Sequence, residues 1–242
     1  MNELLELKKI IAKAENIVFF GGAGVSTDSG IPDFRGSGGL YTDVEDIDEE
    51  PEVILSAAYL YERPREFYRF YRHNMIYPYA DPNETHYALA NLEKQGKLSA
   101  IITQNIDGLH QRAGSKNVIE LHGSVHTNFC IRCGRKHGLD YVLDCDDIPR
   151  CIECGAIVRP NVVLYGESLD NEAFTRAQDA IYNADVLIVG GTSLTVHPAA
   201  SLVDEFMGEH LIIINKTVTP YDEYAEFVLH ESISDIMIKL IE

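Results

Sequence analysis

Short, uninterrupted runs of apolar residues recur along the chain, and several of them end at glycine or at a small polar residue. The first run covers residues 17–20 and stops at Gly21-Gly22, and the run at 186–189 stops at a second Gly-Gly pair. Such runs are typical of strands that are buried on both faces of a parallel sheet. The same pattern predicts further strands at 99–103, 118–121, 162–164 and 211–214.

Segments with helical spacing of apolar residues lie between these runs. The alternation predicts an α/β fold with a doubly wound, mostly parallel sheet and helices on both faces. Polar residues that follow the strands should then meet at one edge of the sheet, where ligands bind. The strand ends near residues 103, 121, 164, 190 and 215 should share this edge. Helices are predicted at the N-terminus and at 84–94, 171–183, 198–207 and 234–241.

Two stretches interrupt the alternation, and we expect them to form a smaller second lobe. Residues 36–81 begin with a loop dense in glycine and acid and continue with helical patterns at 52–61 and 64–76. Residues 124–159 contain all five cysteines. A cleft between two lobes is a common place for a ligand. The remaining segments would build the sheet domain, and they are 1–35, 82–123 and 160–242.

The cysteines predict a metal site. Cys130 and Cys133 form one C-x-x-C knuckle, Cys151 and Cys154 form another, and a glycine follows each pair. Two such knuckles supply four thiolates for tetrahedral zinc, and four sulfurs leave no open coordination position, so this zinc should be structural. Cys145 is left over as a partly buried free thiol or a spare ligand. A zinc ribbon by itself also suits a binding module.

The charge balance excludes one class of function. Lys and Arg number 20 against 38 Asp and Glu, a net charge of −18, and an acidic surface repels phosphate backbones. The same charge fits either plain solubility or attraction of cationic ligands. The N-terminus has no continuous apolar core, and the apolar runs are far shorter than the roughly 20 residues that span a bilayer. We therefore expect a cytoplasmic protein with no direct nucleic-acid or membrane binding.

A glycine loop follows the first predicted strand. Gly22-Ala23-Gly24 would present backbone N–H groups that favour a phosphate. The dinucleotide fingerprint of ordinary dehydrogenases needs a third glycine, and this chain has Thr27 at that position. The acids at the expected distance, Asp43 and Glu45, follow no strand pattern, so a dehydrogenase fits poorly.

Longer motifs are more specific. Residues 21–36 read GGAGVSTDSGIPDFRG, 103–110 read TQNIDGLH, 120–123 read ELHG, 160–167 read PNVVLYGE and 190–198 read GGTSLTVHP. With these motifs and the cysteine knuckles in this order, the chain resembles the sirtuins, NAD-dependent protein-lysine deacylases, over essentially its whole length. The resemblance implies a Rossmann-like NAD-binding domain, a cofactor loop and helical insertion at 36–81, and one structural zinc.

The resemblance also implies the reaction and its residues. An acyl-lysine protein or peptide would react with NAD to give deacylated lysine, nicotinamide and O-acyl-ADP-ribose. His122 is the expected general base, and Asn105 is expected to be a second catalytic residue. The backbone of the substrate would pair with the rim that contains Val163, Leu164 and Gly166. The cofactor set is Gly22, Ala23, Thr27, Phe34, Arg35, Gln104, Ile106, Asp107, Thr192, Ser193, Asn215 and Ile233.

Independent of the resemblance, His122 differs from the other eight histidines in its context. It ends a predicted buried strand, a glycine follows it, and it shares the sheet edge with Gln104 and Asn105. An imidazole with an ordinary pKa of about 6.5 suits proton removal near neutrality. His110 lies in a loop-helix segment and is expected to be structural.

Two differences from the relatives that remove acidic acyl groups bear on the acyl group expected for this chain. Relatives that prefer succinyl or malonyl lysine carry alanine where this chain has Thr27, together with a Tyr-x-x-Arg pair. Here Tyr68 is followed three residues later by Tyr71, with Arg72 one step beyond. Because no cation is clearly placed for an acidic acyl chain, we expect acetyl or longer neutral acyl groups.

Two other classes of function stay open at this point. A mono-ADP-ribosyltransferase on the same scaffold would use the same NAD pocket. A non-enzymatic zinc-ribbon adaptor is the second, although it would not need His122, Asn105 and Asp107 together. The sequence leaves the protein targets and the oligomeric state open.

Overall fold

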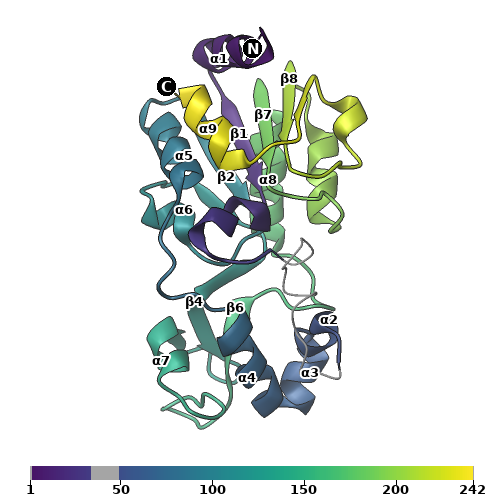
Figure 1. Cartoon of the computed structure of the whole chain (residues 1–242). Helices are drawn as coiled ribbons and strands as arrows, with labels where there is room; N and C mark the ends of the chain where they lie inside the picture. Colours follow the sequence, from purple (N-terminus) through teal and green to yellow (C-terminus); the bar gives the residue numbers. More distant parts are fainter. Residues whose placement is uncertain (1, 34–48, 242) are drawn as a thin grey trace.

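A six-stranded parallel sheet forms the larger lobe of the computed structural model, which describes residues 2–33 and 49–241 (Figure 1). The strand order is β3-β2-β1-β7-β8-β9, and every neighbouring pair is parallel. The parallel sheet predicted from the apolar runs is therefore confirmed. The strands are β1 Ile17–Gly21, β2 Leu98–Thr103, β3 Val118–Glu120, β7 Val186–Gly190, β8 His210–Ile214 and β9 Phe227–Leu229.

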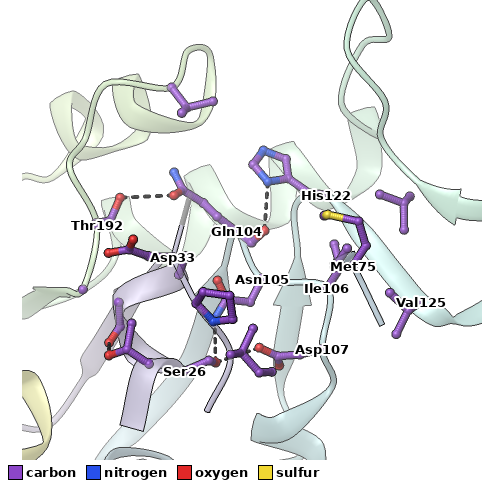
Figure 2. Close-up of a pocket in the computed structure, with 18 of the residues that line it drawn as sticks. Ser26, Asp33, Met75, Gln104, Asn105, Ile106, Asp107, His122, Val125 and Thr192 are labelled. Carbon is purple, nitrogen blue, oxygen red and sulfur yellow. Dashed lines mark hydrogen bonds between the residues drawn. The ribbon is translucent and has the colours of Figure 1, made fainter. Parts of the chain in front are cut away.

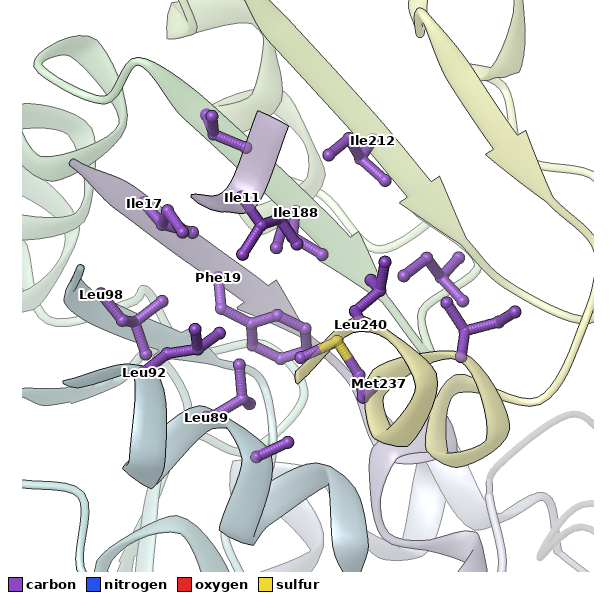
Figure 3. Packing of buried hydrophobic residues seen from close by; sticks show 14 of the residues in the cluster. Ile11, Ile17, Phe19, Leu89, Leu92, Leu98, Ile188, Ile212, Met237 and Leu240 are labelled. Carbon is purple, nitrogen blue, oxygen red and sulfur yellow. The ribbon is translucent and has the colours of Figure 1, made fainter. Parts of the chain in front are cut away.

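Alternate residues of the strands face two separate hydrophobic layers, because side chains of a strand point to opposite faces in turn. Ile17 and Phe19 face the layer covered by helices α1 (Asn2–Lys13), α5 (Glu84–Lys94) and α9 (Ile233–Ile241). Figure 3 shows Phe19 among Leu89, Leu92 and Met237 in this layer. Val18 and Phe20 face the other layer, beneath helix α8 (Asn171–Tyr182) and a 3-10 turn at Ala199–Glu205.

Local capping explains where two of these helices begin. Asn83 precedes α5, and its side-chain oxygen accepts from the Thr85 N–H at 3.0 Å while His86 Nδ1 accepts from the Asn83 N–H at 3.2 Å. Asp170 caps α8 by accepting from the Ala173 N–H at 2.8 Å. Such caps satisfy N–H groups that the helix itself leaves without partners.

The smaller lobe combines a three-stranded antiparallel sheet with short helices. Its strands, in the order β5-β4-β6, are β5 Lys136–Gly138, β4 Gly123–Cys130 and β6 Val158–Val162. A third hydrophobic core lies between this sheet and the helices of the insertion. The helices of this lobe are α2 Pro51–Ile54, α3 Ala57–Glu62, α4 Pro64–Asn74 and α7 Leu139–Leu143.

The expected strand at 162–164 is wrong. Val162 is the last residue of β6, which pairs with β4 in the small antiparallel sheet rather than with the large sheet. The apolar run there is buried by the core of the small lobe, so it has the composition of a central strand without being one. The residues after 164 consequently reach the cleft from the opposite lobe. The wider division of the chain into domains stays a prediction.

Other elements differ in detail from the prediction. The helix expected at 52–61 is two short helices, because Ser56 caps a new helix by accepting from the Tyr59 N–H at 3.2 Å. The helix expected at 198–207 is a 3-10 turn, in which the Ser201 N–H bonds the Pro198 carbonyl three residues earlier. Strand β9 is not among the strands predicted from the sequence. Among residues 2–33 and 49–241, no helix has both the length and the apolar character that crossing a membrane requires.

Phe19 provides a test of the central core. Its side chain is fully buried, so Phe19→Ala should lower the free energy of unfolding by about 3–5 kcal/mol, from lost burial and an unfilled cavity. Urea titration followed by circular dichroism measures the change. Tyr79→Ala is the matched control, because Tyr79 is 94% exposed and its loss should cost less than about 0.5 kcal/mol. Equal effects for the two variants would contradict the assigned core.

Candidate functional site

A cavity of about 1000 Å³ lies where the two lobes meet, and its walls come from both sheets. The loops after β1, β2, β7, β8 and β9 contribute residues, as does His122 after β3. These are the carboxyl ends of parallel strands, the usual ligand-binding edge of such a sheet. The segment after β6 closes the cavity from the small lobe.

The cavity brings together nearly all the residues predicted for the site. Gly22 is the exception among the described ones, because it is buried behind the wall. Phe34 and Arg35 lie outside the described residues. The predicted residues that line the cavity are Ala23, Thr27, Gln104, Asn105, Ile106, Asp107, His122, Val163, Leu164, Gly166, Thr192, Ser193, Asn215 and Ile233.

Glycines let the loops after β1 and β7 touch. The Gly24 N–H donates to the Gly191 carbonyl at 2.8 Å, and a Cβ on Gly24 would lie 2.8 Å from the Gly191 Cα. A Cβ on Gly22 would lie 2.8 Å from the Thr192 Cβ. Only residues without side chains allow this approach. The two loops thereby form a cradle of backbone that lines the cavity at Ala23, Gly24 and Gly191.

Ser26 connects the β1 loop to the segment after β2. Its Oγ donates to the Asp107 Oδ2 at 2.7 Å and accepts from the Asn105 Nδ2 at 3.0 Å (Figure 2). The other Asp107 oxygen, Oδ1, accepts from the Leu109 N–H at 2.9 Å. Asn105 and Asp107 are therefore held in fixed orientations. Sequence reasoning did not single out Ser26, although it lies two residues after Gly24 in the quoted motif.

His122 is held in one tautomer. Its Nδ1 lies 2.9 Å from the Gln104 carbonyl oxygen, which can only accept, so Nδ1 carries the hydrogen and Nε2 keeps the lone pair. Burial lowers the pKa of His122 below its ordinary value, and the bond to Gln104 opposes that shift. The imidazole is consequently neutral at physiological pH and can accept a proton at Nε2.

The chain on either side of His122 is fixed by the small lobe. The His122 carbonyl accepts from the Val163 N–H at 2.9 Å. Gly123 has φ of +75°, and a Cβ there would lie 2.0 Å from the Asn161 carbonyl oxygen. Glycine is therefore required at the point where the chain passes from β3 into β4.

Gln104 bridges two walls of the cavity. Its Oε1 accepts from the Thr192 Oγ1 at 3.1 Å, while its Nε2 is buried without a hydrogen-bond partner among the described residues. A buried donor without a partner is costly, and a ligand acceptor would relieve that cost. The unpaired amide and the glycine cradle together fit a dinucleotide, which offers ribose hydroxyls and phosphate oxygens.

The loop after β8 forms the other end of the cavity. The Asn215 Nδ2 donates to the Thr217 carbonyl at 2.8 Å, and the Asn215 carbonyl lies 3.0 Å from the His230 Nδ1. Ser193 Oγ and Thr195 Oγ1 lie 2.8 Å apart. Ile233 begins α9, and its Cδ1 would lie 2.1 Å from a Cβ on Gly190. These contacts fix the shape of this end.

An ion pair shapes the rim on the small lobe. Arg159 donates to both oxygens of Glu167, at 2.6 and 2.9 Å, and Glu167 Oε2 also accepts from the Leu164 N–H at 2.9 Å. These bonds hold the pKa of Glu167 below its ordinary value, with the Arg159 guanidinium as the main cause. The segment with Val163, Leu164 and Gly166 is thus anchored. The sequence patterns did not reveal this pair, because Glu167 ends the quoted motif 160–167 but Arg159 lies just outside it and nothing in the motif indicates a partner.

Two histidines near the site have different settings. His126 lines the cavity, and its Nε2 lies 2.8 Å from the Asp107 carbonyl oxygen, a contact that no motif indicated. His110 is buried, packs its ring 4.7 Å from that of His86, and does not line the cavity. Its setting agrees with the structural role expected for it.

The four knuckle cysteines converge away from the cavity. Their sulfurs all lie within 4.8 Å of one another, with 3.4 Å between Cys130 and Cys154 and 3.6 Å between Cys133 and Cys151. Tetrahedral zinc with Zn–S bonds of about 2.3 Å requires sulfurs about 3.8 Å apart. The cluster fits a closed zinc site. Cys145 is a free thiol outside it.

Comparisons with known proteins agree with this geometry. The model of the Sir2 family matches residues 22–198. An NAD-dependent protein deacetylase of Clostridium acetobutylicum is 52% identical over 238 residues, which cover 98% of this chain and 97% of the relative. Another, from Cutibacterium acnes, is 54% identical, covering 94% of this chain and 93% of the relative.

Solved structures show the same relationship. A Sir2 complex with a p53 peptide and NAD+ is 39% identical with a TM-score of 0.84, covering 99% of this chain and 96% of that chain. A Sir2 variant with deacetylated p53 peptide and 3′-O-acetyl ADP ribose is 38% identical with a TM-score of 0.89, covering 98% and 96% of the two chains. This chain therefore belongs to the Sir2 family, whose motifs its sequence carries.

Proposed function

We propose that this chain is an NAD-dependent protein-lysine deacetylase, which produces deacylated lysine, nicotinamide and O-acyl-ADP-ribose. The observation that supports it most is the neutral His122, whose Nε2 lone pair is free to accept a proton in the cavity that Gln104, Asn105 and Asp107 line. Relatives named as NAD-dependent protein deacetylases at about 50% identity favour deacetylation over transfer of ADP-ribose to a protein.

NAD, when bound, supplies a ribosyl carbon that carries nicotinamide as its leaving group. The backbone cradle at Ala23 and Gly191 would hold its pyrophosphate, with Thr27 beside it. Gln104 and Asn105 would bind ribose hydroxyls or an ordered water. Ile106 and Asp107 would hold the nicotinamide amide, for which the carboxylate supplies only acceptors and the backbone must supply a donor.

The remaining residues would orient the two substrates. Thr192, Ser193, Asn215 and Ile233 would bind the adenosine half. The rim at Val163, Leu164 and Gly166 would pair with the backbone of an acyl-lysine peptide, and His122 would accept a proton from a ribose hydroxyl. A cavity closed to water around bound NAD would favour attack by the acyl oxygen over hydrolysis of NAD.

The proposal also covers the binding partners of the protein and its location in the cell. The net charge of −18 supports lysine-rich protein substrates and disfavours direct binding of nucleic acid. A cytoplasmic location and the absence of membrane binding agree with the short apolar runs of the sequence.

His122→Ala should reduce kcat/KM for an acetyl-lysine peptide by about 10²–10⁴-fold, because the general base is lost. O-acetyl-ADP-ribose formation, followed by mass spectrometry, measures the change. Zinc content and the unfolding midpoint should match the wild type, because His122 Nδ1 contributes only one hydrogen bond to the fold. Near-normal turnover by the variant would remove His122 as the base.

The pH dependence follows from the lowered pKa of His122. A base acts only when neutral, and burial disfavours its charged form, so kcat/KM should stay high as pH falls and decline only below about pH 6.5. Initial rates measured between pH 5 and 9 give the acid side of this pH profile. The zinc content is checked at each pH. A midpoint clearly above pH 7 would show that another group controls the acid side.

Removal of zinc should unfold the two cysteine knuckles and lower activity, because the metal joins two knuckles that share little other core. The Cys151→Ser variant should contain no zinc, as measured by inductively coupled plasma mass spectrometry, where the wild type contains one zinc per chain. Its melting temperature should be lower than that of the wild type. Cys145→Ser is the matched control and should keep one zinc, since Cys145 stands outside the cluster. Loss of zinc from the Cys145 variant would contradict the four-cysteine assignment.

A further inference from the structure

Two residues of strand β4 in the small lobe hold the segment that follows β2 in the large lobe. The Val125 N–H donates to the Ile106 carbonyl at 3.0 Å, and both residues line the cavity (Figure 2). The next residue of β4, His126, places its Nε2 2.8 Å from the Asp107 carbonyl oxygen. Two consecutive carbonyls of the segment are therefore bonded to two consecutive residues of β4.

The His126 ring is the donor in its contact with the segment. A carbonyl oxygen can only accept, so the His126 Nε2 carries a hydrogen, whether the imidazole is neutral or charged. The arrangement is the opposite of that at His122, whose Nδ1 carries the hydrogen and whose Nε2 keeps the lone pair. The His126 nitrogen that faces the segment is therefore a donor and not a base.

The ring of His126 also lies against the backbone of the segment. Gly108 has φ of +72°, and a Cβ there would lie 2.7 Å from both the Cδ2 and the Nε2 of His126. A side chain at position 108 would consequently push the imidazole away from the Asp107 carbonyl. The glycine in the motif at 103–110 thus serves the turn and also leaves space for a ring from the other lobe.

Asp107 is held from both lobes by these contacts. In the large lobe, its Oδ2 accepts from the Ser26 Oγ at 2.7 Å and its Oδ1 accepts from the Leu109 N–H at 2.9 Å. Those two bonds fix the carboxylate, whereas the bond from His126 fixes the peptide group that joins Asp107 to Gly108. A peptide group next to glycine rotates easily, because glycine has few steric restrictions. The bond from His126 opposes that rotation.

We propose that His126 is a positioning residue for the leaving group of the reaction, and that it holds Ile106 and Asp107 in the conformation that binds the nicotinamide amide. The inference rests on the proposed deacetylase function and deepens it, because it names a small-lobe residue that controls the affinity for nicotinamide. His126 acts through the backbone of Asp107. When a segment spends part of its time in another conformation, its ligand binds more weakly in proportion to the competent fraction that is lost.

The test measures inhibition by nicotinamide, which is a product of the reaction, with the full-length zinc-loaded enzyme, NAD and an acetyl-lysine peptide. His126→Phe keeps a planar ring but has no donor, so the inhibition constant of nicotinamide should rise about three- to tenfold, the effect of losing one hydrogen bond. His126→Ala also lacks the donor and should show at least the same rise. His126→Gln keeps an N–H donor of similar reach and should stay within about twofold of the wild type. KM for the peptide should change by less than about twofold in all three variants, because the peptide is expected on the rim at 163–166.

His137→Phe is the matched control. It makes the same substitution in β5 of the same small sheet, but His137 does not line the cavity, and its ring lies 4.4 Å from that of Tyr141. Inhibition of this variant by nicotinamide should match that of the wild type. The melting temperature of each variant is also measured, because a general loss of folding lowers the active fraction and leaves the inhibition constant unchanged.

Three results would overturn the proposal. They are unchanged inhibition in the phenylalanine and alanine variants of His126, equal weakening in His126→Gln, and equal weakening in the His137 control. Failure of the deacetylase function itself would appear differently, because the wild type would then release no nicotinamide from NAD with the acetyl-lysine peptide, and the inference would fall with it.

Discussion

The contact on which the site depends is the meeting of two backbones at Gly24 and Gly191. Strands β1 and β7 are neighbours in the sheet, so their following loops leave the sheet edge side by side. Side chains at these positions would force the loops apart, because a Cβ on Gly191 would lie 2.5 Å from the Val25 nitrogen. The close approach fixes the position of Ser26, whose side chain bonds to Asn105 and Asp107. It also brings the Thr192 hydroxyl within hydrogen-bonding distance of the Gln104 side chain. The relative positions of several polar side chains that line the cavity therefore depend on this one contact.

Much of the fold could be predicted from the sequence because its signals are local. Apolar runs flanked by glycine mark the buried strands, and four cysteines in two knuckles mark the metal cluster. The strand at 162–164 was misassigned for the same reason, since an apolar run does not say which sheet buries it. Its partner is β4, about 40 residues earlier, and that pairing depends on the whole small lobe.

The residues of the site also divide into those that the sequence identifies and those that only the structure reveals. Motif residues such as His122 and Gln104 could be selected by their position after strands, and the cavity contains them. Ser26, His126 and the pair of Arg159 with Glu167 act through partners that lie 8 to 81 positions away in the chain. Side-chain pairing over such distances leaves no periodic trace. The tyrosine at position 71 is similar, because the sequence reveals its presence and only the packing reveals that its hydroxyl is buried without a partner in the described part of the chain.

The bond between the Val163 N–H and the His122 carbonyl ties together two places where the chain crosses between the lobes. One crossing leaves the large sheet after β3, and the other returns from β6. A rotation of the small lobe that preserves this bond has its pivot beside the imidazole. Such a rotation would widen or narrow the cleft away from the pivot, while the separation of His122 from Gln104 stays nearly constant because both follow strands of the large sheet. Opening of the cleft by such a rotation would leave the hydrogen bond of the proposed base undisturbed.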